Sequence, residues 1–288
     1  PCGFKTTAEI NVSALGDSAQ VVVLQDDTDA PQDSTTASST TYGEPNSDYD
    51  GTNDGANTGQ TGKFGDAWNF DGNDGNNSGE HDHVDADGLA GDTDAGATIR
   101  SVSVWAKQNN NGNTHNDGWI MSWGNNNAPN NADHHFVIKD AWGSLEFAMR
   151  DGGTLMYEAR SSSNTLFLDH QWHHIVVTYG TEAKLYLDGV NIPSSGWSNN
   201  SDVTAWIDSD MGKFTIGSSA GHYIPNYINA KSWDGSLDQI LIYSDELTES
   251  EVTALWNSGN GDTTPDGGNL IAHYDFEQTG STLENVAI

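Results

Sequence analysis

Residues 171–190 have the sequence QWHHIVVTYGTEAKLYLDGV, and this stretch decides the fold class of the chain. Residues 172–179 are rich in β-branched and aromatic side chains, a composition that favours a strand. After a Gly-Thr-Glu turn, apolar and polar residues alternate over residues 183–188, as in a strand with one buried face. Asp188-Gly189 is a typical two-residue turn. The stretch therefore predicts two antiparallel strands.

Similar strand patterns recur along the chain, separated by turns rich in Gly, Asn and Asp. Residues 99–107, IRSVSVWAK, put Val and Ala on one face and Ser and Trp on the other, which predicts a half-buried strand. Further strands are predicted at residues 119–123, 136–139, 145–150, 155–159, 214–217 and 237–243. One short helix follows: a capping box at residues 248–251 begins it, and Gly259 is predicted to end it.

Composition limits the function classes. The chain of 288 residues is long enough for one large β domain with a sizeable core, and its single cysteine, Cys2, excludes an internal disulfide. Its 42 acidic and 10 basic residues give a net charge of -32, which argues against nucleic acid and acidic membrane surfaces as partners. Such a surface suits salty water, where repulsion is screened, or carries carboxylates clustered around Ca²⁺.

Insertion into a membrane is not expected, because no apolar run is long enough to span one. The chain begins at Pro1 without a signal peptide. Either an initiator Met has been removed, which fits a virion protein released by lysis, or the chain is a processed or incomplete piece.

The central hairpin, WHHIVVTY followed by LYLDGV, resembles the signature of laminin-G-like modules in the concanavalin A-like lectin/glucanase superfamily. Residues 62–72, GKFGDAWNFDG, are similar to the opening segment of that family, and residues 235–243, GSLDQILIY, to its closing strand. The resemblance implies an all-β fold: a jelly-roll sandwich of two antiparallel sheets with one short C-terminal helix. It leaves function open, because the superfamily contains lectins, adhesion modules, virion proteins and glycoside hydrolases.

Four segments are predicted. Residues 1–25 form an N-terminal arm or the first strands, residues 26–62 an acidic low-complexity loop, and residues 63–260 the laminin-G-like sandwich. Residues 261–288 form a linker followed by a strand-like run, NLIAHYDFE. This run resembles the opening strand of a second repeat. It could equally be a terminal strand that pairs within this domain or with a neighbouring subunit.

Catalysis is not expected. Glucanases of the superfamily carry Glu-x-Asp-x-x-Glu on one strand, whereas the nearest match here, residues 80–85, is EHDHVD and ends in Asp. His81, His83 and Asp85 alternate and could share one strand face as ligands of a transition metal. Histidine is frequent in the strands of this chain, so packing is the favoured interpretation.

Calcium is the metal that the resemblance implies, since Ca²⁺ often ties the opening strand to the closing strand in laminin-G-like modules. Asp238 lies in the closing-strand motif, and Asp26, Asp27 and Asp71 are the proposed opposite ligands. The alternative is that Asp71 and Asp238 stabilise turns through hydrogen bonds to the backbone.

Aromatic side chains in loop-like sequence are the candidates for carbohydrate binding, because sugar C–H faces stack on rings. They are Trp142, Trp197, Trp206, Tyr223 and Tyr227. The prediction is a non-catalytic, extracellular module of a virion or microbial surface that recognises a glycan. One alternative is a purely structural subunit that assembles through its terminal strands, and a less favoured one is a glycoside hydrolase.

Overall fold

A computed structural model describes the backbone of residues 47–72, 82–86, 88–89, 99–109, 118–124, 135–141, 144–151, 154–161, 169–180, 182–193, 213–218, 233–263, 265 and 269–287. All of these residues belong to one compact unit, Tyr42–Ile288. The predicted N-terminal arm, residues 1–25, lies outside the described residues, as does most of the predicted acidic loop.

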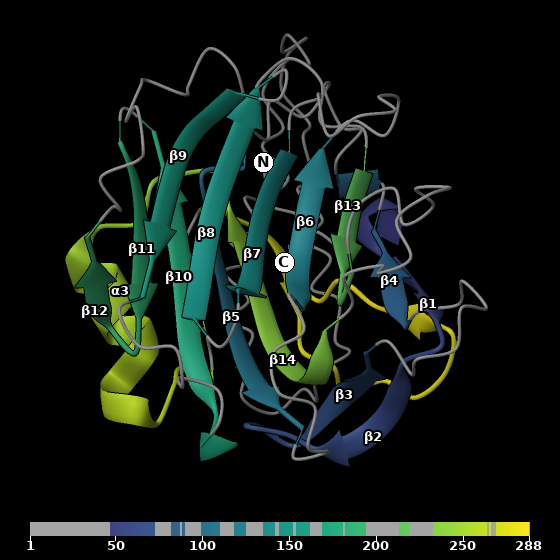
Figure 1. The fold of residues 1–288 in the computed structure, drawn as a ribbon. Coiled ribbons are helices and arrows are strands. Elements are labelled where there is room, and N and C mark those ends of the chain that lie inside the picture. The colour runs from purple at the N-terminus through teal and green to yellow at the C-terminus, as the bar shows by residue number, and fades with distance from the viewer. Residues whose placement is uncertain are drawn as a thin grey trace, which may run out of the picture. The chain divides into compact units, whose positions relative to one another are not determined.

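Two antiparallel sheets pack face to face as a sandwich (Figure 1). Sheet A has the strand order β16 (Thr282–Leu283), β1 (Gly51–Asp54), β4 (His83–Asp85), β13 (Lys213–Ile216), β6 (Trp119–Gly124), β7 (His135–Ala141), β8 (Ser144–Asp151) and β9 (Thr154–Arg160). Sheet B has the order β12 (Val190–Ile192), β11 (Ala183–Leu187), β10 (His173–Tyr179), β5 (Ser101–Gln108), β14 (Asp234–Tyr243), β3 (Asp66–Asp71) and β2 (Asn57–Thr61). The all-β, antiparallel jelly-roll prediction is confirmed.

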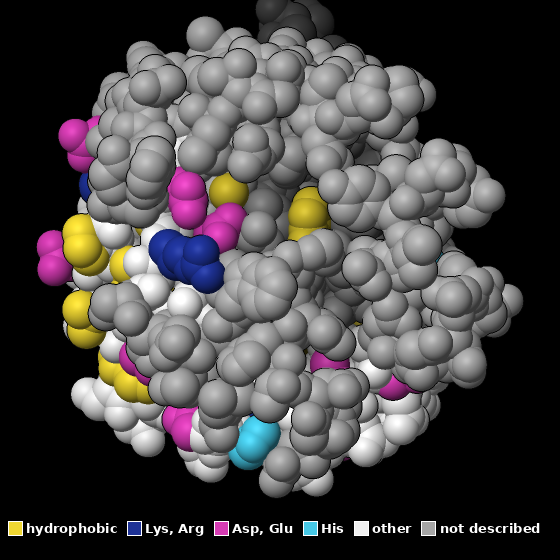
Figure 2. Space-filling view, in the orientation of Figure 1, with side chains coloured by type: hydrophobic (Ala, Val, Ile, Leu, Met, Phe, Trp, Pro, Cys, Tyr) yellow, Lys and Arg dark blue, Asp and Glu magenta, His cyan; other side chains and the backbone are white. Residues whose placement is uncertain are grey.

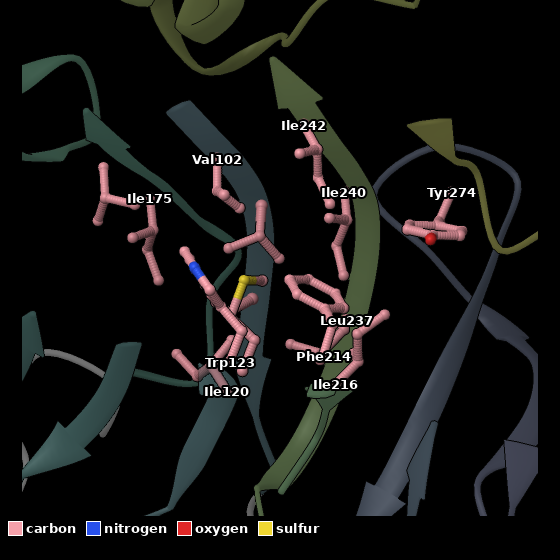
Figure 3. Close-up of a cluster of buried hydrophobic side chains, with 14 of the residues drawn as sticks. Val102, Ile120, Trp123, Ile175, Phe214, Ile216, Leu237, Ile240, Ile242 and Tyr274 are labelled. Carbon is pink, nitrogen blue, oxygen red and sulfur yellow. The ribbon is translucent and has the colours of Figure 1, made fainter. Parts of the chain in front are cut away.

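The hydrophobic core lies between the two sheets. Sheet B contributes Val102 and Ile175, and sheet A contributes Trp123 and Phe214, all fully buried (Figure 3). In the central hairpin, Val177 of β10 pairs with Leu185 of β11, and both belong to this core. The alternation that predicted two strands therefore also identified their inward faces.

A short helix, α3 (Glu249–Trp256), covers the outer face of sheet B. Its N-cap is Thr248, whose Oγ1 accepts a hydrogen bond from the Glu251 N–H at 3.3 Å, so the predicted capping box is present. The helix ends at Trp256 with Asn257 in the left-handed conformation, before the predicted Gly259, and a 3-10 turn, η4 (Asn257–Gly259), follows. No helix in the described part of the chain is long and apolar enough to cross a membrane.

The prediction that β5 is half-buried is wrong, because α3 covers the outer face of sheet B. The apolar side chains of α3 pack on outward-facing residues of β10, β11 and β14, in a second cluster of Val176, Tyr186, Leu241, Tyr243, Leu247, Val252 and Leu255. The outward-facing Trp105 of β5 stacks on Trp256, with ring centroids 5.4 Å apart. Residues Ser101 to Ala106 are consequently buried on both faces of the sheet.

The predicted loop of residues 26–62 is wrong over residues 51–61, where β1 and β2 lie. Their sequences, GTND and NTGQT, contain no large apolar residue, so no hydrophobic pattern marked them. β1 joins sheet A by pairing with β4 and β16, and β2 joins sheet B by pairing with β3. Backbone hydrogen bonds to neighbouring strands, rather than their own side chains, define these two strands.

The C-terminal segment pairs within this domain. Strand β15 (Leu270–Tyr274) pairs with β14 of sheet B, and β16 pairs with β1 of sheet A. The Tyr274 hydroxyl donates to the Tyr49 carbonyl at 2.6 Å, next to the 3-10 helix η2 (Ser47–Tyr49), and the Asn285 N–H donates to Asp50 Oδ1 at 2.8 Å. Of the three explanations for this segment, pairing within the same domain is the one observed.

Candidate functional site

Asp238 occupies an irregular position in β14. The register shifts between Asp238 and Leu241, and Gln239 has a φ of 41°, so β14 has a bulge next to Asp238. The carboxylate is fully buried; its Oδ2 accepts a hydrogen bond from the Phe64 N–H at 2.8 Å, and its Oδ1 has no partner among the described residues. Burial raises the pKa of Asp238 to about 7, although the backbone N–H groups of Phe64, Lys63 and Gln239 act to lower it.

Asp71, the other described calcium candidate, does not meet Asp238. It lies exposed at the end of β3, opposite Asp234, which is four residues from Asp238 along β14 and hence about 13 Å away. The Asp71 N–H donates to Asp82 Oδ2 at 2.9 Å. Asp71 and Asp238 therefore do not fit a single ion.

The two remaining candidates, Asp26 and Asp27, lie outside the described residues. Within the described ranges, no group of three or more His, Cys, Asp or Glu side chains is arranged to hold a metal ion. The buried, unpartnered Asp238 Oδ1 is the one observation here that suits a cation, and Ca²⁺ stays a prediction.

The His-Asp motif on β4 forms a polar contact on the outer face of sheet A. His83 Nε2 lies 3.6 Å from Asp85 Oδ2 and 3.9 Å from Asp54 Oδ2, so His83 and Asp85 share one face as predicted. Asp85 Oδ1 accepts from the Thr215 hydroxyl at 3.1 Å. Desolvation raises the pKa of Asp82 to about 6, although the hydrogen bond from the Asp71 N–H acts to lower it. Glu80 and His81 lie outside the described residues.

Figure 2 shows this side of the molecule, where a basic side chain stands beside acidic ones among many undescribed residues. In the described part, Arg160 Nη1 on β9 lies 4.0 Å from Glu146 Oε2 on β8. Sheet A thus carries mixed charge at its β8–β9 edge.

The five aromatic candidates, Trp142, Trp197, Trp206, Tyr223 and Tyr227, all lie outside the described residues. The strands that flank them are described. The β7–β8 and β13–β14 connections, which contain Trp142, Tyr223 and Tyr227, follow strand ends beside the start of β6, at the lower end of the sandwich in Figure 1. Trp197 and Trp206 precede Lys213, which pairs with Gly124 at the opposite end of β6.

Sequence reasoning missed a row of side chains on the outer face of sheet B, near the same lower end. The polar row, as we call it, consists of Trp172, Lys107, Ser236, Asn69 and Asn57. Lys107 pairs with Ser236, Ser236 with Asn69 and Asn69 with Asn57, so these residues lie side by side across four strands. Trp172 directly precedes β10, and Lys107 Nζ lies 5.1 Å from its ring centroid. Residues so far apart in sequence gave no local signal.

Comparison with known proteins supports the fold assignment. A laminin G family model, described as the concanavalin A-like lectin/glucanases superfamily, matches residues 76–253, more than half of the chain. The chain therefore belongs to this superfamily and is a laminin-G-like member of it. No curated protein sequence gives a significant match.

Among solved structures, a tryptophan-to-alanine mutant of HCR D/C VPI 5995 is 14% identical, with a TM-score of 0.51 over 73% of this chain and 47% of that chain. A receptor binding domain is also 14% identical, with a TM-score of 0.50 over 73% and 46% of the two chains. A heptameric SAP-like pentraxin from Limulus polyphemus is 17% identical, with a TM-score of 0.42 over 66% and 81%. The present chain spans less than half of the first two structures, and these likenesses concern the fold alone.

Proposed function

We propose that this chain is a non-catalytic glycan-recognition module displayed on a virion or a microbial surface. Its membership of the concanavalin A-like superfamily over residues 76–253 is the observation that carries the proposal. The similar structures include one described as a receptor binding domain, which is consistent with recognition at a surface.

The surroundings of the carboxylates near β4 support a non-catalytic role. A retaining or inverting glycosidase needs two carboxyl groups that face the same sugar bond. Asp82 accepts the backbone N–H of Asp71, and Asp85 accepts the hydroxyl of Thr215. These hydrogen bonds join neighbouring segments of the fold, which is a structural use of both carboxylates. The departure of residues 80–85 from Glu-x-Asp-x-x-Glu points the same way.

Ca²⁺ is part of the proposal as a stabilising ion, with Asp238 as the residue that would hold it. The buried Oδ1 of Asp238 has no partner in the described ranges, and Ca²⁺ prefers carboxylate oxygen. Asp71 is left out of this assignment, because its partner across the sheet is Asp234.

The alternative function, a structural subunit that assembles through its terminal strands, is less favoured because its C-terminal strands pair within the same chain. Strands β15 and β16 pair with β14 and β1 of the same chain, so they are already occupied as sheet partners. A structural subunit would therefore have to assemble through other surfaces.

A glycan array probed with the purified chain tests the proposal, with and without Ca²⁺. Binding to a defined set of glycans, together with no release of reducing ends from those glycans over a long incubation, is the expected result. Absence of binding to any glycan would refute recognition, and cleavage of a bound glycan would refute the non-catalytic assignment.

A further inference from the structure

The polar row crosses the outer face of sheet B at a place that helix α3 leaves open. Trp105, two residues before Lys107 on the same face, is 1% exposed, because it stacks on Trp256 of the helix. Lys107, Trp172 and Asn69 are half-buried, Ser236 is buried, and Asn57 at the far end is exposed. The row crosses five neighbouring strands, from β10 to β2, a length of about 19 Å at the usual strand spacing.

The row offers the chemistry that binds sugars. Trp172 supplies an aromatic ring, Lys107 an ammonium group and Asn57 an exposed amide. Asn69 Nδ2 donates to Ser236 Oγ at 3.1 Å and to Asn109 Oδ1 at 2.8 Å, which fixes the middle of the row. Asn69 and the buried Ser236 are therefore bonded within the fold, and they hold Trp172 with Lys107 at one end of the row and Asn57 at the other.

Lys107 contacts an aromatic ring, which is an unusual environment for a lysine in so acidic a chain. The formal net charge is -32, yet no carboxylate pairs with Lys107 among the described residues, and its ammonium group lies over the ring of Trp172. By contrast, Lys184 Nζ lies 3.3 Å from Glu246 Oε1, and Lys63 Nζ donates to the Gly259 carbonyl at 2.5 Å. An unpaired ammonium group beside an aromatic ring suits a ligand that brings its own carboxylate.

Carboxylates in the next row restrict where a second acidic group could bind. Asp234 and Asp71 face each other two residues beyond Ser236 and Asn69, on the same side of the sheet and about 7 Å further along the strands. This distance is within the Debye length at physiological ionic strength, about 8 Å, so they repel a second acidic sugar over Asn69.

We propose that the polar row binds a glycan chain through one acidic sugar, a uronate or sialate. The sugar ring lies against Trp172 and its carboxylate meets Lys107, while neutral sugars extend along the row toward the exposed amide of Asn57. This inference rests on the proposed glycan recognition and deepens it, because it names the site and the class of sugar.

The test uses an array of oligosaccharides that end in glucuronate, galacturonate or sialate, printed beside neutral counterparts and polyuronates. Lys107→Met removes the charge at similar length, Lys107→Arg retains it, and Trp172→Ala removes the ring. Lys184→Met is the matched control. We expect Lys107→Met and Trp172→Ala to weaken binding of acid-terminated glycans about tenfold or more. Lys107→Arg and Lys184→Met should bind within about twofold of the wild type.

The outcomes separate this inference from the proposed function. Binding that tolerates both Lys107→Met and Trp172→Ala would overturn the polar-row site and leave glycan recognition standing. Equal binding of acidic and neutral counterparts, or a preference for polyuronates, would overturn the assignment of a single acidic sugar. If the wild type bound no glycan on the array, both proposals would fail.

Discussion

Replacing Asp238 with Asn tests whether a buried, ionisable carboxyl group weakens the fold at alkaline pH. The pKa of Asp238 rises from 3.8 to about 7 on folding, mainly through burial. A raised carboxyl pKa contributes stability that is fully present below pH 3.8 and lost as pH rises through about 7. The amide that replaces the carboxyl group in Asp238→Asn is neutral at every pH. Between pH 5 and pH 8, the wild type should therefore lose about 2–3 kcal/mol relative to Asp238→Asn.

The assay is urea denaturation of both proteins at pH 5 and pH 8 in the presence of a Ca²⁺ chelator. The quantity measured is the difference between their free energies of unfolding and its change with pH, which removes the pH effects that both proteins share. Glu284→Gln, at an exposed position, is the control and should shift with pH as the wild type does. A difference between wild type and Asp238→Asn that stays constant from pH 5 to pH 8 would refute the reasoning.

The same pair of proteins tests calcium. If Asp238 holds Ca²⁺, adding the ion at pH 8 should raise the free energy of unfolding of the wild type and leave Asp238→Asn unchanged. Equal stabilisation of both proteins would place any Ca²⁺ site elsewhere.

Three further predictions concern the fold. Thr248→Ala should lower the free energy of unfolding by about 1 kcal/mol in urea denaturation, because the N-cap of α3 is lost, whereas Thr248→Ser should be nearly neutral. Gly217→Ala should cost about 2–4 kcal/mol, since φ is +80° and the new Cβ would lie 2.3 Å from Phe70 Cδ1; a cost below about 1 kcal/mol would contradict the geometry. Burial lowers the pKa of His174 to about 3, so its stabilising contribution is lost as pH falls below about 6.5. His174→Phe should therefore lose about 2–3 kcal/mol less than the wild type between pH 7 and pH 4.5, as thermal unfolding at each pH would show.

Strands with a clear apolar pattern could be predicted from the sequence. The central hairpin and the capping box of α3 depend on local signals, namely β-branched runs, a turn and a Thr-x-x-Glu spacing, and both are present in the structure. Strand β1, GTND, has no such signal, because it exists through hydrogen bonds to β4 and β16. The burial of both faces of β5 depends on α3, more than 140 residues later in the sequence.

The candidate site could be predicted less well, because ligand sets depend on register. Asp71 and Asp238 each matched a family motif, yet the pairing of Asp71 with Asp234 separates them along β14. The polar row shows the converse: Lys107, Ser236 and Asn69 are distant in sequence and meet only through strand pairing. A sequence pattern identified the strands that carry these residues, but it could not determine which residues face each other.

During synthesis, β1 can pair with β16 only after residues 282–283 have been made. Asp50, next to β1, accepts a hydrogen bond from Asn285, 235 residues later, so sheet A cannot be completed until that residue has left the ribosome. At about 5–20 residues per second, this delay is on the order of 10–50 s. During it, β1 would have one unpaired edge, which in an apolar strand would recruit other nascent chains. The polar sequence GTND, which concealed this strand from sequence analysis, also protects it from aggregation while its partner is still being made.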